Sequence, residues 1–264
     1  MSANFDRRSF IRKAIAVSGG ATAGMLSFEE RNLLAQAAGP AAPSVSAAGD
    51  KIPMGKIGPL QVSRIFCGGN LIGGWAHSRD LIYVSKLVKA YHTDEKVFET
   101  LELAESQGIN SILTNPNAAR VINRYWKERG GHIQWFSDCA LGGHPLKEGI
   151  RISVEEGAHS VYVQGGIGDK LVSDGKVEEL GEALEYIKEL GVPGGLGAHR
   201  LETVKAAVDA GCNPDYWVKT LHPVDYWSAD IEPENDNIYC RKPEETIAYM
   251  KTIEKPWIAF KVMA

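Results

Sequence analysis

The sequence lacks several patterns that most readily assign a function. None of its four cysteines forms a CxxC pair, which argues against a structural zinc site. It has no basic stripe, since 29 Lys and Arg residues stand against 33 Asp and Glu residues for a net charge of −4, so nucleic acid is not an expected partner. No apolar run is long enough to span a bilayer. The absence of a GxGxxG pattern argues against a nucleotide-binding doubly wound sheet.

The first fifty residues have a composition of their own. Arg7 and Arg8 are followed by a second basic pair and then by a weakly apolar, glycine- and alanine-rich segment. This resembles a bacterial twin-arginine export signal, and the alternative is a basic N-terminal helix of a cytoplasmic protein. We therefore expect a signal peptide over 1–37, a flexible linker over 38–50 and a folded domain over 51–264. The resemblance implies transit through the twin-arginine translocase to the periplasm or the exterior.

From residue 51 onward, short apolar runs alternate with amphipathic stretches. After a predicted hairpin over 51–63, the predicted strands are 64–70, 109–115, 133–139, 160–166, 194–199, 216–222 and 257–263. Strands alternating with helices indicate a parallel α/β fold, and we predict a (β/α)8 TIM-type barrel. Seven of its strands are present here, and we expect the native polypeptide to continue past Ala264, since an eighth strand and helix need about thirty more residues.

Polar residues occur where the predicted strands end, which is the end of a (β/α) barrel that carries the active site. Alternation along each strand predicts that these side chains point into the barrel, with the aliphatic faces under the helices. The predicted set is Asn70, Asn115, Asp138, Gln164, His199, Lys219 and Lys261. The alternative is a polar plug that only satisfies its own hydrogen bonds.

Within this set, four residues are the catalytic candidates: Asp138, His199, Lys219 and Lys261. Asn70, Asn115, Gln164 and the later His222 are expected to bind the substrate. A buried lysine has a lowered pKa and serves as a base or forms a Schiff base. Asp138, His199 and His222 are the candidate ligands of a divalent metal, although they lack the close spacing of a known metal motif. Trp75, Tyr226 and Trp227 lie in long loops after two strands, where aromatic rings either stack on a sugar or simply pack on the barrel.

Three segments resemble the aldo-keto reductase family: MGKIGPLQVSRIFCGGN, ESQGINSILTNP and VEELGEALEYIKELGVPGGLGAHRLETVKAAVDAG. The resemblance implies an eight-stranded barrel, a nicotinamide cofactor such as NADP and an Asp–Tyr–Lys–His tetrad. The tetrad is missing here. Thr114 and Asn115 stand in place of the aspartate, residues 116–119 contain no tyrosine, and Asp138 and Gln164 fall where the lysine and histidine belong.

Three functions remain open from the sequence. The first is an exported oxidoreductase of the aldo-keto reductase type that acts on a small carbonyl or carbohydrate-like substrate. The second is a cofactor-free or metal-assisted sugar isomerase, epimerase or lyase that uses Lys219 and His199. The third is a barrel that binds a ligand without turning it over, although charged groups inside a barrel are costly to keep without a purpose.

Overall fold

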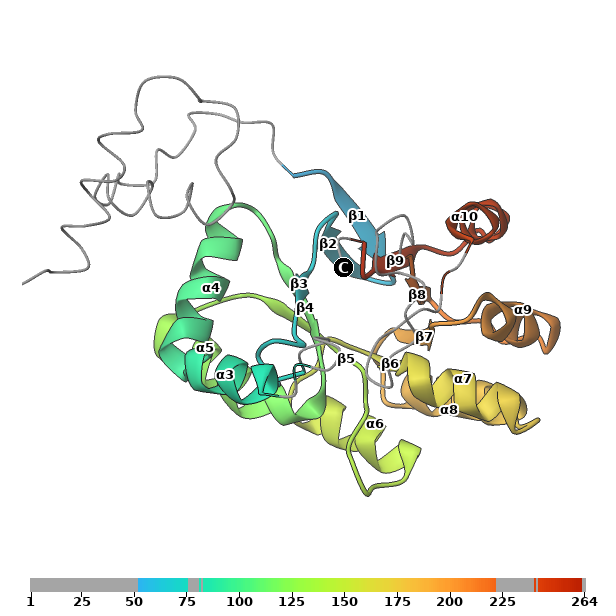
Figure 1. Cartoon of the computed structure of the whole chain (residues 1–264), viewed down its shortest axis with the longest axis horizontal. Helices are drawn as coiled ribbons and strands as arrows, with labels where there is room; N and C mark the ends of the chain where they lie inside the picture. Colours follow the sequence, from blue (N-terminus) through green and yellow to red (C-terminus); the bar gives the residue numbers. More distant parts are fainter. Residues whose placement is uncertain (1–51, 76–80, 82, 222–239, 241, 263–264) are drawn as a thin grey trace, which may run out of the picture. The chain divides into compact units, whose positions relative to one another are not determined.

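The computed structural model describes residues 52–75, 81, 83–221, 240 and 242–262, and residues 51–264 form one compact unit (Figure 1). The predicted signal peptide and linker lie outside the described residues. No helix in the described ranges is both long and apolar enough to cross a membrane. The strands are β1 Met54–Ile57, β2 Leu60–Ser63, β3 Cys67–Gly68, β4 Ser111–Thr114, β5 Gln134–Ser137, β6 Ser160–Val163, β7 Gly194–Ala198, β8 Tyr216–Thr220 and β9 Trp257–Phe260.

Helices connect the strands in the expected order. They are α3 Val84–Tyr91, α4 Asp94–Ser106, the short 3-10 helix η1 Pro116–Ala118, α5 Ala119–Arg129, α6 Leu146–Glu155, α7 Gly165–Ser173, α8 Glu178–Glu189, α9 Leu201–Asp209 and α10 Pro243–Met250. Gly130 adopts the left-handed conformation that closes α5, as glycine does at many helix ends.

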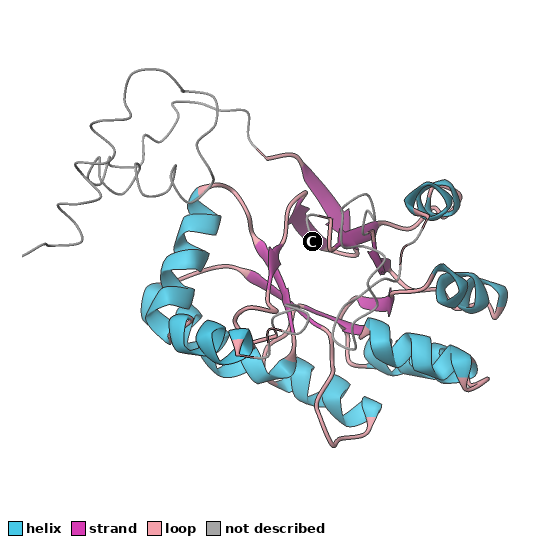
Figure 2. Cartoon of the chain, in the orientation of Figure 1, coloured by secondary structure: helices cyan, strands magenta, loops and turns pink. Residues whose placement is uncertain are grey.

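Strands β3 to β9 form one parallel seven-stranded sheet in sequence order (Figure 2). The sheet curls, and the helices lie along its outer side, as both figures show. This confirms the prediction of a TIM-type (β/α) fold, of which the described residues make a half-barrel. Strand β3 is shorter than predicted, because only Cys67 and Gly68 keep strand geometry within the glycine-rich run after Phe66.

Two hydrophobic clusters fill the two sides of this sheet. The larger one packs Ile112, Trp135, Val161, Leu196 and Trp217 against the helices. The smaller one, on the concave side, contains the strand residues that alternate with these: Leu113, Phe136, Tyr162, Tyr216, Val218 and Phe260. Because both sides are buried, most strand positions on both faces are apolar, as expected for a parallel sheet under helices.

The β1–β2 hairpin closes the amino-terminal end of the strands. Its Ile57 and Val62 are buried in the concave-side cluster. The side chain of Asn110, just before β4, accepts a hydrogen bond from Ser63 N at 2.8 Å and donates one to Gln61 O at 2.9 Å. The hairpin was predicted from the sequence, and these contacts attach it to the strands.

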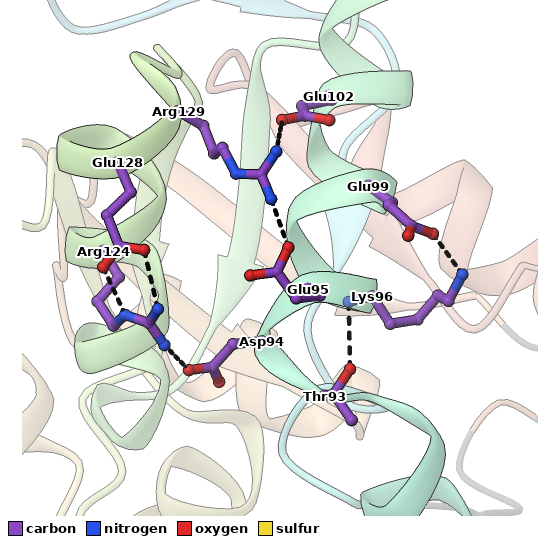
Figure 3. A network of polar contacts seen from close by, with 9 residues as sticks. All are labelled: Thr93, Asp94, Glu95, Lys96, Glu99, Glu102, Arg124, Glu128 and Arg129. Carbon is purple, nitrogen blue, oxygen red and sulfur yellow. Dashed lines mark hydrogen bonds and ion pairs between the residues drawn. The ribbon is translucent and has the colours of Figure 1, made fainter.

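Helices α4 and α5 are tied together on the surface by ion pairs (Figure 3). Asp94 accepts hydrogen bonds from the guanidinium groups of Arg120, at 2.6 and 2.7 Å, and of Arg124. Arg129 reaches Glu95 and Glu102 on α4. Because most of these groups are exposed, each pair contributes little to stability, about 1 kcal/mol or less.

Two helices were not predicted from the sequence, and one of them builds the site. Helix α3 was expected to be loop, and its side chains pack little, since none of them is buried. Helix α7 starts with Gly165 and contains Gly168, and glycine disfavours helix interiors. Its apolar residues Ile167 and Leu171 nevertheless pack on the core at helical spacing.

Candidate active site

The polar residues predicted at the strand ends lie along one rim of the half-barrel. Asn115 follows β4 and caps η1, with its side-chain oxygen 3.0 Å from Asn117 N. Gln164 follows β6 and caps α7, accepting hydrogen bonds from Gly166 N at 2.7 Å and Ile167 N at 3.1 Å. Both were predicted to bind substrate, and that role stays a prediction. In this structure their side chains satisfy the first amides of the following helices.

Asp138 is the carboxylic acid of this rim. It follows β5 on the concave side, and its side chain accepts one hydrogen bond from Ala140 N at 2.9 Å. Burial raises the pKa of Asp138 to about 6, and the hydrogen bond from Ala140 only partly offsets this effect. Its charge in turn adds to the burial that raises the pKa of Tyr162 on the neighbouring strand. Asp138 therefore changes its protonation state near neutral pH, as a general acid or base should.

Backbone strain marks the same rim. In the described part of the chain, Cys139 (φ 49°) and Lys261 (φ 58°) are the non-glycine residues with left-handed backbone. Each comes just after a strand, Cys139 next to Asp138 and Lys261 after β9. Such conformations are disfavoured for residues other than glycine and gather at functional sites. The strain supports the assignment of the site to the carboxyl-terminal strand ends.

His199, after β7, is held by a residue that sequence reasoning missed. Asp169 of α7 accepts hydrogen bonds from His199 Nδ1 at 2.9 Å and from His199 N at 3.1 Å. The same carboxylate accepts from Arg200 N at 3.3 Å and from the Thr203 hydroxyl at 2.7 Å. Only 13% of each of the Asp169 and His199 side chains is exposed. Burial by itself raises the pKa of Asp169, but the hydrogen bonds from His199 and Thr203 outweigh it and leave the pKa below its usual value.

Lys219 does not point into the barrel, so its predicted orientation is wrong. It alternates with Tyr216 and Val218 of the concave-side cluster and shares a face with Trp217, which packs under the helices. Its ammonium group is fully buried and donates to His199 O and Thr220 O, both at 2.7 Å. Burial lowers the pKa of Lys219, while electrostatic interactions with Cys240, Asp169 and Glu202 oppose that shift.

Lys261 was predicted on the same face as Ala259 and Trp257. Trp257 packs with the helix-side cluster, so that face too points outward. The left-handed backbone at Lys261 interrupts the alternation, and its ammonium lies 5.8 Å from the centroid of the Phe260 ring. The Phe260 ring in turn lies edge-on to the His199 ring, with 5.6 Å between the centroids. Lys261 thus contacts a ring of the concave-side cluster, whereas Lys219 shares the helix-side face with Trp217.

The loop after β3 places Trp75 beside Asn115. A side chain at Gly73 would come within 2.6 Å of the Trp75 ring and 3.5 Å of the Asn115 amide nitrogen, so both lie against this glycine. Trp75 is 59% exposed. Asn70 begins the same turn, and its carbonyl oxygen accepts a hydrogen bond from Trp75 N at 2.8 Å. The three residues predicted from this part of the rim therefore lie together.

The remaining predicted residues cannot be placed. His222, Tyr226 and Trp227 lie outside the described residues. Over those that are described, no group of three or more His, Cys, Asp or Glu side chains could hold a metal ion. Asp138 and His199 stand on strands that are separated by β6, and each carries its own hydrogen bonds. All four cysteines are free thiols.

No protein-family model matches the chain, and no curated protein sequence is significantly similar to it. Similar solved structures include QR15, described as an aldolase, with 14% identity and a TM-score of 0.39 over 48% of this chain and 61% of that chain. A putative deoxyribose-phosphate aldolase from Coccidioides immitis is 9% identical, with a TM-score of 0.40 over 63% of this chain and 66% of that one. A truncated 3-deoxy-D-arabino-heptulosonate 7-phosphate synthase from Thermotoga maritima is also 9% identical, with a TM-score of 0.44 over 79% of this chain and 69% of that one.

These matches concern the fold alone, and the first two span less than two thirds of the length of the solved chains. They nevertheless correct the family expected from the sequence. The resemblance to aldo-keto reductases is wrong, because the similar structures are aldolases and a synthase, and no reductase family model matches. The three segments that carried the resemblance are parts of a (β/α) barrel, and many enzyme families share that architecture. The nicotinamide cofactor was implied by that resemblance alone.

Proposed function

We propose that this chain is a barrel enzyme of the lyase, isomerase or epimerase type that moves a proton on a small carbonyl or carbohydrate-like substrate. The observation that supports this most directly is the rim itself. It combines a carboxylic acid with a pKa of about 6, Asp138, and an imidazole held by a carboxylate, His199. We assign His199 as the base and Asp138 as the acid.

Protonation states support these two roles. Because Asp169 can only accept at His199 Nδ1, the neutral ring carries its proton there and Nε2 is the basic nitrogen. Asp138 keeps its proton to a higher pH than an ordinary aspartate, since burial disfavours its charge. A base and an acid with these properties suit proton removal next to a carbonyl group with proton donation to the carbonyl oxygen.

Spacing supports a small substrate. Strands β5 and β7 are separated by β6, which sets their axes about 10 Å apart. This spacing of the two strands matches the length of a substrate of a few carbon atoms. Trp75, with the Asn115 amide beside it, offers an aromatic face and a hydrogen-bonding group of the kind that bind a hydroxylated carbon chain.

In the proposed step, His199 Nε2 takes the proton from the carbon next to the carbonyl while Asp138 gives its proton to the carbonyl oxygen. The C–H electron pair becomes the new C=C bond of an enol. Return of a proton to the same carbon gives epimerisation. Return of a proton to the former carbonyl carbon gives isomerisation when the neighbouring carbon carries a hydroxyl group, which loses its proton and becomes the new carbonyl. In a lyase the bond that breaks next to the carbonyl is C–C rather than C–H, and the base takes the proton from a hydroxyl group.

Solvent exchange tests this proposal on a range of carbonyl compounds at once, so the substrate need not be identified first. The full chain is incubated in D2O with a panel of small aldoses, ketoses, their phosphates and keto acids, and deuterium incorporation is followed by NMR. We expect exchange on at least one compound, lowered about 100-fold or more by D138N and by H199Q. The control D174N changes an exposed aspartate just after α7 whose side chain pairs with Lys170. Binding of a panel compound without any exchange would favour the non-catalytic alternative.

Lysine chemistry is tested separately. Lys219 is buried and donates to two main-chain carbonyl oxygens, so we expect no adduct on it when the protein is treated with borohydride in the presence of panel carbonyl compounds. Mass spectrometry of the peptide that contains Lys219 provides the measurement. A reduced Schiff base at this residue would replace the acid–base proposal with a lysine-dependent lyase.

We also propose that the protein is exported, on the basis of Arg7 and Arg8. The measurement is the location of the full chain in a bacterium with a twin-arginine system, compared with a variant in which both arginines are lysine. We expect the variant to stay in the cytoplasm. Equal distribution of the two proteins would contradict export by this route.

A further inference from the structure

The carboxylate of Asp169 is enclosed by hydrogen-bond donors. Its Oδ2 faces His199 N and His199 Nδ1, and its Oδ1 faces Arg200 N and the Thr203 hydroxyl. Arg200 immediately precedes α9 and Thr203 lies in its first turn, so Asp169 holds the start of that helix from a neighbouring one. A single side chain therefore links α7, the end of β7 and the start of α9.

Close packing of α7 on β7 makes this reach available. A side chain at Gly168 would come within 2.6 Å of Gly197 O, and one at Gly165 within 2.9 Å of His199 Cε1. These glycines argue against a helix on propensity, but they allow α7 to pack closely on β7. They bring Asp169 within hydrogen-bonding distance of the imidazole.

His199 is held at its main chain as well as at its ring. Asp169 accepts from its N–H, and the ammonium of Lys219 donates to its carbonyl oxygen at 2.7 Å. The ring lies between the Asp169 carboxylate, the start of α7 and the edge of Phe260. The backbone of His199 is thus fixed on both sides, and the carboxylate at Nδ1 is a contact that orients its ring.

We propose that Asp169 is a positioning residue that sets the tautomer and the orientation of His199, so that Nε2 is the basic nitrogen presented on the rim. Lys219 supports the same residue from the helix side by holding its main-chain carbonyl. This inference rests on the proposed function for its catalytic meaning. The tautomer itself is a property of the protein alone.

The test is the tautomer of His199, read from two-bond 15N–1H correlation spectra of the full chain labelled in histidine. Spectra are recorded where the ring is neutral, and H199Q identifies the signals. We expect the Nδ1–H tautomer in the native protein. In D169A the acceptor is gone, so we expect the Nε2–H tautomer to appear. In D169N the amide oxygen can still face His199, while the amide group faces the Thr203 hydroxyl and leaves Arg200 N without its acceptor. We therefore expect the Nδ1–H tautomer to persist in a less stable protein.

Two comparisons keep this test independent of folding and of the substrate. D174A, at the end of the same helix, should leave the spectrum unchanged. If D169A does not fold, the tautomer of the native ring still decides the inference. A native ring with its proton on Nε2, or a D169A spectrum identical to the native one, would overturn the inference.

Deuterium exchange separates this inference from the proposed function. We expect D169A to lower exchange about 10- to 100-fold, as for other residues that orient a functional histidine, with D174A within about twofold of native. The expected tautomers with no exchange on any panel compound would refute the proposed function alone. Exchange that depends on His199, with an unchanged tautomer in D169A, would refute the role of Asp169 alone.

Discussion

The two ends of the half-barrel differ in how their polar groups are satisfied. At the amino-terminal end, Ser160 bonds both Pro193 O and Tyr216 OH at 2.8 Å, and the Asn110 amide ties the hairpin to β4. At the carboxyl-terminal end, Cys139 and Lys261 have left-handed backbone, and burial raises the pKa of Asp138 above its usual value.

The two ends of the strands therefore have different roles in the protein. The hairpin end has relaxed geometry and an apolar filling, which favour stability. The opposite end keeps strain and a partly buried acid, which cost stability and are retained where chemistry needs them. Mutations at the first end should therefore change stability alone. Mutations at the second should change stability and activity in opposite directions.

The largest effect is expected at the hairpin. Ile57→Ala removes a side chain that is 2% exposed in the concave-side cluster, and we expect it to lower the free energy of unfolding by about 2–5 kcal/mol. Denaturant titration gives this value, and Met54→Ala, at a 51% exposed position in the same hairpin, should change little. Loss of deuterium exchange per folded molecule in Ile57→Ala would break the division between the two ends.

Asp138→Asn should raise the free energy of unfolding rather than lower it. The folded protein raises the pKa of Asp138 from 3.8 to about 6, so its contribution to stability is fully present below pH 3.8 and is lost as the pH rises through 6. Asparagine does not ionise, so the variant does not lose this stability as the pH rises. Its amide oxygen can still accept the hydrogen bond from Ala140 N. At pH 8 we expect a gain of up to about 3 kcal/mol, since one pKa unit corresponds to about 1.4 kcal/mol.

The measurement is the free energy of unfolding of both proteins between pH 4 and pH 8. Their difference should be close to zero at the acid end and grow through pH 6. A constant difference over this range would contradict the raised pKa. A higher free energy of unfolding together with a loss of deuterium exchange would show that Asp138 lowers the stability of the protein and is needed for its activity.

Gly168→Ala tests the approach of α7 to β7. The added methyl group would lie 2.6 Å from Gly197 O, a main-chain atom, so the helix must shift, at a cost of about 1–3 kcal/mol. The matched control is Gly181→Ala in α8, where nothing lies within 4 Å, and there we expect a gain of about 0.5–1 kcal/mol. Both values come from denaturant titration. Equal effects of the two substitutions would show that α7 does not need its glycine for close packing.

The smallest effect is expected on the surface between α4 and α5. Glu128→Gln removes the partner of Arg124 in an exposed pair at 2.7 Å, and we expect a loss of at most about 1 kcal/mol that disappears in high salt. Unfolding at low and high salt measures it. A loss as large as that of Ile57→Ala would mean that the helical surface, rather than the hairpin end, dominates stability.

Much of the fold could be predicted because its signals are local. Apolar runs and amphipathic stretches located the seven parallel strands and six of their helices, and glycine-proline marked the hairpin turn. The same patterns placed Asp138 and His199 at the ends of β5 and β7. They did not reveal α7, because Gly165, Gly166 and Gly168 argue against a helix on propensity alone.

The sequence by itself determined the strand order, the parallel sheet and the level at which the polar residues stand, since these follow from periodicity and chain connectivity. Only the tertiary structure decided which way β8 faces. Both faces of a buried parallel strand are apolar, so alternation groups Trp217 with Lys219 without saying which side the helices cover. The tertiary structure also decided the pairing of Asp169 with His199. Thirty residues separate them in the chain, and only the packing of α7 against β7 through glycine brings their side chains into contact.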